Sequence, residues 1–142
     1  MTDDDARAIM TRTRPTGTGP RAVALAQAVA RIETRYGRGW TCPGMIDSHN
    51  WGAIHARDGA SCLDHDASGR PYTARFALYE SDLAGASALW EQLWRRAPVR
   101  RVLMDDALDA DGLARAMRVT GYFEAPAEHY ARMLRAALRE IV

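Results

Sequence analysis

The sequence lacks an excess of charge of either sign. Its 19 basic and 18 acidic residues leave a formal net charge of +1 at pH 7. So small a net charge creates no strong field for a phosphate backbone, and we expect no nucleic-acid partner. Lysine is absent, so every basic residue other than histidine is arginine. We interpret this as a compositional bias of the source genome, without functional content.

Long apolar runs are also missing. No stretch reaches the roughly 18 apolar residues of a membrane-spanning helix, so we expect no membrane span. The chain begins Met1-Thr2-Asp3-Asp4-Asp5, which is acidic and lacks the apolar segment of a secretory signal. If the substrate lies outside the cytoplasm, we expect release by another route, such as a phage, an injection-machine carrier, a pore or lysis.

Cysteine occurs only twice, at Cys42 and Cys62, which bracket the segment Asn50–His55. In an oxidising compartment a disulfide would close this loop and stabilise the fold by roughly 3 kcal/mol in the chain-entropy model. Two free thiols are an alternative. A metal site is another, with the neighbouring histidines His49, His55 and His65. Because paired Cys-x2-Cys units are absent, we expect no metal and no cofactor.

The length of 142 residues favours one domain with a real core. Residues 1–19 are predicted to be an N-terminal tail, with a short helix at Asp3–Met10 and then a linker rich in Thr, Pro and Gly. Residues 20–142 are predicted to form an α+β domain, mostly α, with a small inserted β-hairpin lobe.

The first long helix is predicted over Arg21–Tyr36, with apolar residues at the spacing of one helical face. Gly37 suits the left-handed residue that ends a helix. A polar stretch at Asp58–Pro71 lies between two strand-like runs. The second run, Tyr72–Tyr79, alternates, with one face formed by Tyr72, Ala74, Phe76 and Leu78.

Further helices are predicted after the hairpin. One is capped by Ser81 or Asp82 and ends near Arg96, before Pro98. A shorter helix runs from Asp109 or Asp111 to Val119. The last begins near Pro126 and continues to the C-terminus, with inward residues that include Tyr130, Met133 and Leu134.

Glu33 is the most informative residue, because it lies on the apolar stripe of the first long helix. A carboxyl group that faces a core loses water, and its pKa rises. An acid that keeps its proton at neutral pH is what the cleavage of a glycosidic bond requires. The alternative is a frayed helix end at which Glu33 pairs with Arg35 or Arg57.

Four sequence segments in order resemble a known family. They are Ala26-Gln27-Ala28 with Glu33-Thr34-x-Tyr36-Gly37, then Asn50-Trp51-Gly52-Ala53-Ile54, then Phe76-x-x-Tyr79, and last Gly121-Tyr122 followed by Pro126 and Tyr130-Ala131. This order resembles the lysozyme-fold glucosaminidases of glycoside hydrolase family 73, the flagellar-rod and autolysin type. The resemblance covers roughly residues 20–140 and implies a lysozyme-like catalytic domain.

The resemblance also implies roles for matching residues. Glu33 would be the general acid, and Tyr122 would lie near the scissile sugar. The implied substrate-binding residues are Asn50, Trp51, His55, Tyr79 and Tyr130. The segment at Asn50 is one residue shorter than the family's Asn-Leu-Phe-Gly, and His55 replaces a common lysine.

A second carboxylate would come from the inserted lobe. Inverting enzymes place it about 6.5–9.5 Å from the acid, and retaining enzymes about 5–5.5 Å. The candidates are Asp58, Asp64 and Asp66; Asp66 is preferred and Asp64 is next. They are otherwise ordinary residues of a solvated turn. Substrate-assisted attack by an N-acetyl group, or transglycosylation, would need no second carboxylate.

These residues lead to one hypothesis for function. The protein is predicted to be a peptidoglycan hydrolase that acts at the cell wall and cleaves β-1,4 bonds between N-acetylglucosamine and N-acetylmuramic acid. An N-acetylglucosaminidase is preferred, with a muramidase or lytic transglycosylase as alternatives. A non-catalytic glycan-binding module of a phage or injection particle would keep the cleft but not depend on Glu33. A plain helical interaction module would lack a cleft there.

Overall fold

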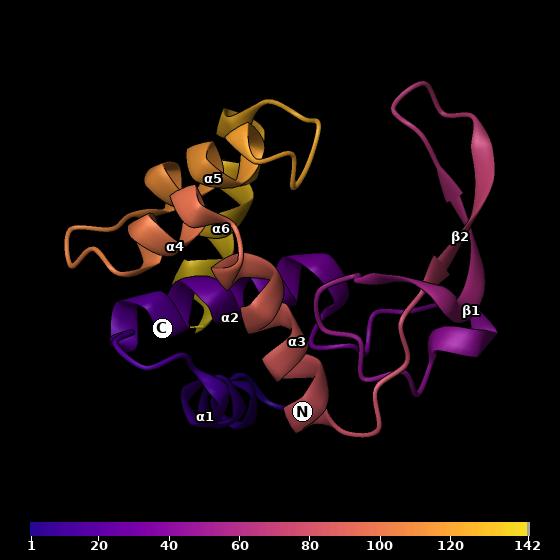
Figure 1. Cartoon of the computed structure of the whole chain (residues 1–142), viewed down its shortest axis with the longest axis horizontal. Helices are drawn as coiled ribbons and strands as arrows, with labels where there is room; N and C mark the ends of the chain where they lie inside the picture. Colours follow the sequence, from indigo (N-terminus) through magenta and orange to yellow (C-terminus); the bar gives the residue numbers. More distant parts are fainter. Residues whose placement is uncertain (142) are drawn as a thin grey trace.

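A computed structural model describes residues 1–141 of the chain. It contains helices around a core and one two-stranded antiparallel sheet. Figure 1 shows the hairpin projecting from one side of the helical body, away from α5 and α6. The elements are α1 (Asp3–Thr13), α2 (Pro20–Thr34), the 3-10 helix η1 (Pro43–Met45), β1 (His55–His65), β2 (Pro71–Phe76), α3 (Asp82–Trp94), α4 (Ala97–Leu103), α5 (Ala110–Val119) and α6 (Ala127–Ile141).

Helix α2 lies at the centre of the helical body and contacts both α1 and α6. Pro20 fits its first turn, where no backbone N–H donor is needed. The predicted apolar stripe is buried at Leu25, Ala26 and Val29. The helix ends earlier than expected, because the left-handed backbone begins at Arg35 rather than at Gly37.

The expected tail at residues 1–19 is instead part of the helical body. Thr2 and Asp5 form a capping box that starts α1. Ala6 and Met10 are fully buried, and the indole Nε1 of Trp90 donates to the carbonyl oxygen of Met10 at 3.0 Å. The core therefore begins before residue 20, since α1 packs against α2 and α3.

The predicted hairpin is present, with β1 and β2 paired from Ala60–Phe76 to His65–Pro71 and a register shift between His55 and Ala60. The second strand is shorter than expected and ends at Phe76. Ala74 and Phe76 are buried, whereas Tyr72 and Leu78 are exposed. The predicted apolar face is thus buried only at Ala74 and Phe76. Tyr72 lies toward the tip, which extends beyond the helical body, and Leu78 follows the end of β2.

The C-terminal helices follow the predicted order, with one addition. Ser81 caps α3 and Asp109 caps α5, each through its side-chain oxygen. Helix α4 was not predicted. The chain turns at Arg96 and starts again with Pro98 in the first turn, where proline is compatible with a helix. Met133 is partly exposed, contrary to its predicted inward position.

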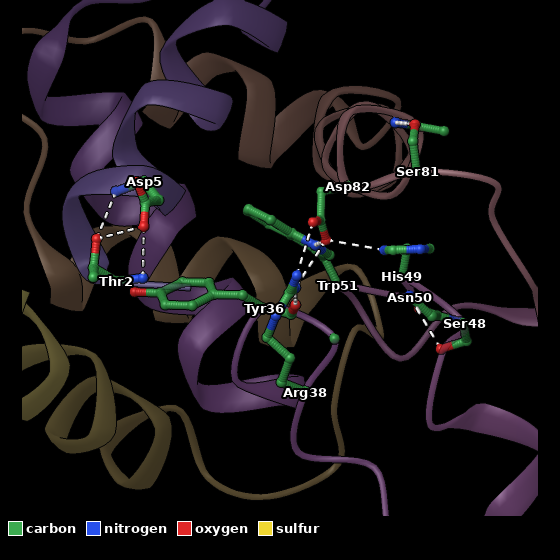
Figure 2. A network of polar contacts seen from close by, with 12 residues as sticks. Thr2, Asp5, Tyr36, Arg38, Ser48, His49, Asn50, Trp51, Ser81 and Asp82 are labelled. Atoms are coloured by element: carbon green, nitrogen blue, oxygen red, sulfur yellow. Dashed lines mark hydrogen bonds and ion pairs between the residues drawn. The ribbon is translucent and has the colours of Figure 1, made fainter.

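A polar network fixes the loop between α2 and β1 against the start of α3 (Figure 2). The carboxylate of Asp82 accepts from both Nη atoms of Arg38 at 2.8 Å and from Trp51 Nε1 at 3.0 Å, and it lies 3.2 Å from His49 Nδ1. These charged and polar partners hold the pKa of Asp82 well below its ordinary value. The loop that leads into the hairpin is therefore anchored to the helical body.

Candidate active site

A cleft of about 630 Å³ lies beside the end of α2. The end of α2 contributes Glu33, the hairpin contributes His55, Leu63 and Asp64, and the end of α3 contributes Arg95 and Arg96. The remaining lining residues come mostly from the loops that follow α2 and precede β1 and from the segment before α6, and include Trp40, Ala53 and Tyr122. Residues far apart in the sequence thus meet in a groove between the helical body and the hairpin.

Glu33 lies in this cleft with its side chain mostly withdrawn from water. Burial raises the pKa of its carboxyl group above the ordinary value of 4.5. A hydrogen bond from Tyr130 opposes this rise only in part, because burial is the larger cause. Within residues 1–141 no arginine or histidine forms an ion pair with Glu33, so the pairing with Arg35 or Arg57 is not found.

The two oxygens of Glu33 have different surroundings. The hydroxyl of Tyr130 donates to Oε1 at 2.7 Å. No donor among the described residues reaches Oε2, and this atom is not among the buried polar atoms that lack a partner. Oε2 is therefore the oxygen that can face a ligand in the cleft.

Two tyrosines of the last loop and helix surround the acid. Tyr130 is buried and stacks on Phe123, with ring centroids 4.4 Å apart. It therefore lies behind Glu33 and holds it, rather than contacting a sugar as the resemblance implied. Tyr122 lines the cleft, and its hydroxyl is buried without a hydrogen-bond partner. Burial and the charge of Glu33 raise the pKa of Tyr122, so its hydroxyl stays protonated and able to donate.

Tyr130→Phe is expected to shift the pH dependence of any acid-catalysed reaction at Glu33. The lost hydrogen bond stabilises the carboxylate form, so its removal raises the pKa of Glu33 further. The high-pH limb, where the acid loses its proton, should move to higher pH. Profiles of kcat against pH test this, and an unmoved high-pH limb would contradict it.

The hairpin places the candidate second carboxylates differently from the prediction. Asp66, the preferred residue, lies in the exposed turn, where its Oδ1 accepts from the backbone N–H groups of Ser68 and Arg70 and from the Ser68 hydroxyl. These hydrogen bonds lower the pKa of Asp66 and fit a residue that shapes the turn. Asp64 instead lines the cleft together with Glu33 and accepts from the hydroxyl of Tyr72 at 3.2 Å. Asp58 is not among the lining residues.

Asn50 and Trp51 do not line the cleft, contrary to the prediction. Both are fully buried. The Asn50 side chain donates to the carbonyl oxygens of Ile54 and Ala77 and accepts from the Ile54 N–H, so it closes the loop before β1. The indole of Trp51 belongs to the network of Figure 2. Their place in the resemblance therefore reflects the shape of this loop rather than sugar contact.

His55 and Tyr79, two other predicted binding residues, differ in their position relative to the cleft. His55 is exposed in the cleft and packs against Phe76, with ring centroids 4.6 Å apart. Tyr79 is not a lining residue; its backbone N–H donates to the carbonyl oxygen of Ser48. The only tryptophan of the lining is Trp40, which donates from Nε1 to the Asn50 carbonyl oxygen and packs on Phe76. The sequence did not predict Trp40 as a cleft residue, and the one available signal was that Trp40 lies outside the apolar stripe of any predicted helix.

Cys42 and Cys62 are joined by a disulfide that lies in the cleft lining. It links the segment before η1 to β1, and a closed loop of this kind stabilises the fold by roughly 3 kcal/mol in the chain-entropy model. We expect Cys42→Ser/Cys62→Ser to lower the unfolding free energy by about this amount. Urea unfolding with and without reductant tests this. The wild type should respond to reductant and the variant should not; equal curves for all samples would contradict the expectation.

Residues 1–141 hold no cluster of three or more His, Cys, Asp or Glu side chains suited to a metal ion. In the same residues, no helix has the length and apolar character needed to cross a membrane.

The chain is similar in structure to a glycoside hydrolase domain, a peptidoglycan hydrolase and the catalytic domain of an autolysin. The glycoside hydrolase domain of FlgJ from Salmonella typhimurium superposes with a TM-score of 0.59 at 22% identity, covering 99% of this chain and 89% of that one. A peptidoglycan hydrolase from Sphingomonas sp. A1 gives 0.64 at 20% identity, with coverage of 97% and 90%. The catalytic domain of the autolysin Auto from Listeria monocytogenes gives 0.63 at 16% identity, with coverage of 98% and 79%.

No family model and no curated protein sequence matches the chain. At these identities the structural likeness shows the fold. The predicted α+β class, mostly α with a small β-hairpin lobe, is confirmed, as is the resemblance to the fold of these hydrolases.

Proposed function

We propose that the protein is a peptidoglycan hydrolase that cleaves β-1,4 bonds of the glycan strand, with Glu33 as general acid. The observation that carries the proposal is the state of Glu33. Its carboxyl group lies in a cleft, has lost most of its water, bonds to a neutral hydroxyl and has no cationic partner in residues 1–141. This combination favours a carboxyl group that retains a proton, which bond cleavage at a glycosidic oxygen needs.

The two carboxyl oxygens of Glu33 have different roles in this proposal. The hydrogen bond from Tyr130 fixes Oε1 and so orients the carboxyl plane. Oε2 carries the proton and donates it to the glycosidic oxygen as the bond to the leaving sugar breaks. Tyr122 lines the same cleft, and its unpartnered hydroxyl would supply a donor for the sugar's acetamido group or for the water.

Asp64 is the protein group best placed to assist on the other side of the sugar. It reaches the cleft from β1, whereas the carboxylate of Asp66 accepts hydrogen bonds within the hairpin turn. Asp64 would act as a base for water or would stabilise the positive charge that develops at the sugar ring. If Asp64→Asn retains near-full activity while Glu33→Gln does not, attack by the substrate's own N-acetyl group replaces this role.

The residues that line the cleft suit the binding of a chain of sugars. Trp40 and the exposed Leu63 offer apolar surface, and His55 and Asp64 offer polar groups along the hairpin. Amphipathic rings such as sugars bind to this mixture of apolar faces and hydrogen-bonding groups. We place the action of the protein at the cell wall, and a phage or injection-machine carrier would deliver it there.

Mass spectrometry of digested sacculi tests the bond that is cut. We expect new reducing ends of N-acetylglucosamine, which identify an N-acetylglucosaminidase. Reducing-end muramic acid would identify a muramidase, and anhydro-muramic acid a lytic transglycosylase. Intact sacculi after prolonged incubation would contradict the enzymatic proposal and leave a glycan-binding module of the same fold.

A further inference from the structure

Two arginines form a basic wall of the cleft. Arg95 and Arg96 follow the last residue of α3 and line the same cleft as Glu33 and Tyr122. In residues 1–141, neither guanidinium forms an ion pair with a carboxylate, although five contacts between other arginines and carboxylates are present. The positive charge of this wall is therefore not neutralised by the protein itself.

Arg96 is held in one position. Its Nη1 donates to the carbonyl oxygen and to Oε1 of Gln92, at 2.7 and 3.1 Å, and its guanidinium carbon lies 4.9 Å from the ring centroid of Tyr122. Its Nε is buried and has no hydrogen-bond partner. An unpaired buried donor is unusual in a folded protein, and it shows that the protein itself pairs this guanidinium only in part.

Arg95 is more exposed and lies beside this fixed group. The charges of both arginines act on the hydroxyl of Tyr122, where they oppose the rise in its pKa. Both arginines line the cleft with Glu33 and Tyr122, and the guanidinium of Arg96 lies over the Tyr122 ring. Guanidinium groups bind planar anions such as carboxylates through paired N–H donors.

We propose, building on the proposed peptidoglycan hydrolase, that Arg95 and Arg96 bind a carboxylate carried by the lactyl substituent of the glycan. A strand built only from N-acetylglucosamine is neutral, whereas the muramic sugar bears an acid through its lactyl ether. The carboxylate belongs either to a stem peptide or, where the peptide has been removed, to the lactyl group itself. The arginine wall selects acid-bearing strands over neutral ones and fixes their register relative to Glu33.

Isothermal titration calorimetry of Glu33→Gln tests this binding without turnover. The probes are chitotetraose, a tetrasaccharide of alternating N-acetylglucosamine and N-acetylmuramic acid with stem peptides, and the same tetrasaccharide stripped of peptides. We expect both acid-bearing probes, or one of them, to bind more tightly than chitotetraose. Whichever binds more tightly identifies the source of the carboxylate.

Arg95→Gln, added to the Glu33→Gln variant, should weaken the binding of the preferred acid-bearing probe about tenfold. This is near the lower end for a charge-assisted hydrogen bond, because Arg95 is exposed. Binding of chitotetraose should not change. Arg95→Lys should restore part of the loss, since it keeps the charge but not the paired donors. Arg101→Gln, an exposed arginine of α4 outside the cleft lining, is the matched control and should have no effect.

Equal weakening of all three probes by Arg95→Gln, or no weakening of any, would overturn the inference while glycan binding and the proposed function stand. Absence of binding of every glycan by the parent would overturn both.

Discussion

Glu33→Gln is expected to abolish cell-wall clearing while leaving the fold intact. The amide keeps the size of the side chain and can still accept from Tyr130, but it has no acidic proton to donate. A positioned general acid contributes about 10²–10⁴-fold to a rate, so we expect kcat to fall by about 10³-fold or more. The measurement is the release of soluble fragments from purified sacculi, with circular dichroism to verify folding.

The matched control is Glu80→Gln, which makes the same change at an exposed residue outside the cleft lining. It should clear cell walls at the wild-type rate. A Glu33→Gln variant that retains clearing would end the assignment of Glu33 as the acid.

Gly85→Ala is expected to unfold or strongly destabilise the protein, although Gly85 is not among the residues that line the cleft. An added Cβ would stand 1.8 Å from the carbonyl oxygen of His49 and 3.2 Å from Cδ1 of Trp51. The carbonyl belongs to the backbone of the loop anchored by Asp82, so it cannot move aside like a flexible side chain. We expect a loss of about 3 kcal/mol or more in unfolding free energy, at the upper end of overpacking.

Gly112→Ala provides the control for the general effect of replacing a helical glycine. There a Cβ would meet only side-chain atoms, the nearest being Oδ1 of Asp109 at 3.2 Å. This variant should have wild-type stability or a gain of up to about 1 kcal/mol from helix propensity. Urea unfolding of both variants makes the comparison, and equal stabilities would show that α3 does not press on the His49 loop.

The fold was predictable where local patterns determine it. Glu33 stood out because its helix has a clear apolar stripe, and Ser81 and Asp109 were recognisable as caps from their residue types. The integration of α1 was not predictable, because Met10 and Trp90 meet across 80 residues of sequence. Helix α4 was not predicted, because Pro98 was expected to mark the end of the preceding helix. Proline also fits the first turn of a new helix, and Pro98 occupies that position in α4.

The site was less predictable than the fold, since it depends on which side of a loop each residue faces. Asn50 and Trp51 look like binding residues in sequence, but the packing of α3 against their loop buries them. Asp64 and Asp66 differ by two positions in the hairpin, and only the geometry of the turn separates a lining residue from a turn residue. The lining arginine Arg96 carried no sequence signal, because the ring of Tyr122, over which its guanidinium lies, is brought to it only by the fold.

A titration of Glu33 is the sharpest test of its assignment as the general acid. Side-chain carboxyl ¹³C shifts of glutamate-labelled protein, followed from acid to neutral pH, give the pKa of each glutamate, and the signal missing from Glu33→Gln identifies Glu33. We expect a midpoint for Glu33 above 4.5, its ordinary value, because burial raises the pKa of this carboxyl group. A midpoint at or below 4.5 would show a carboxylate that is already ionised where a proton donor is required, and would contradict a role of Glu33 as general acid.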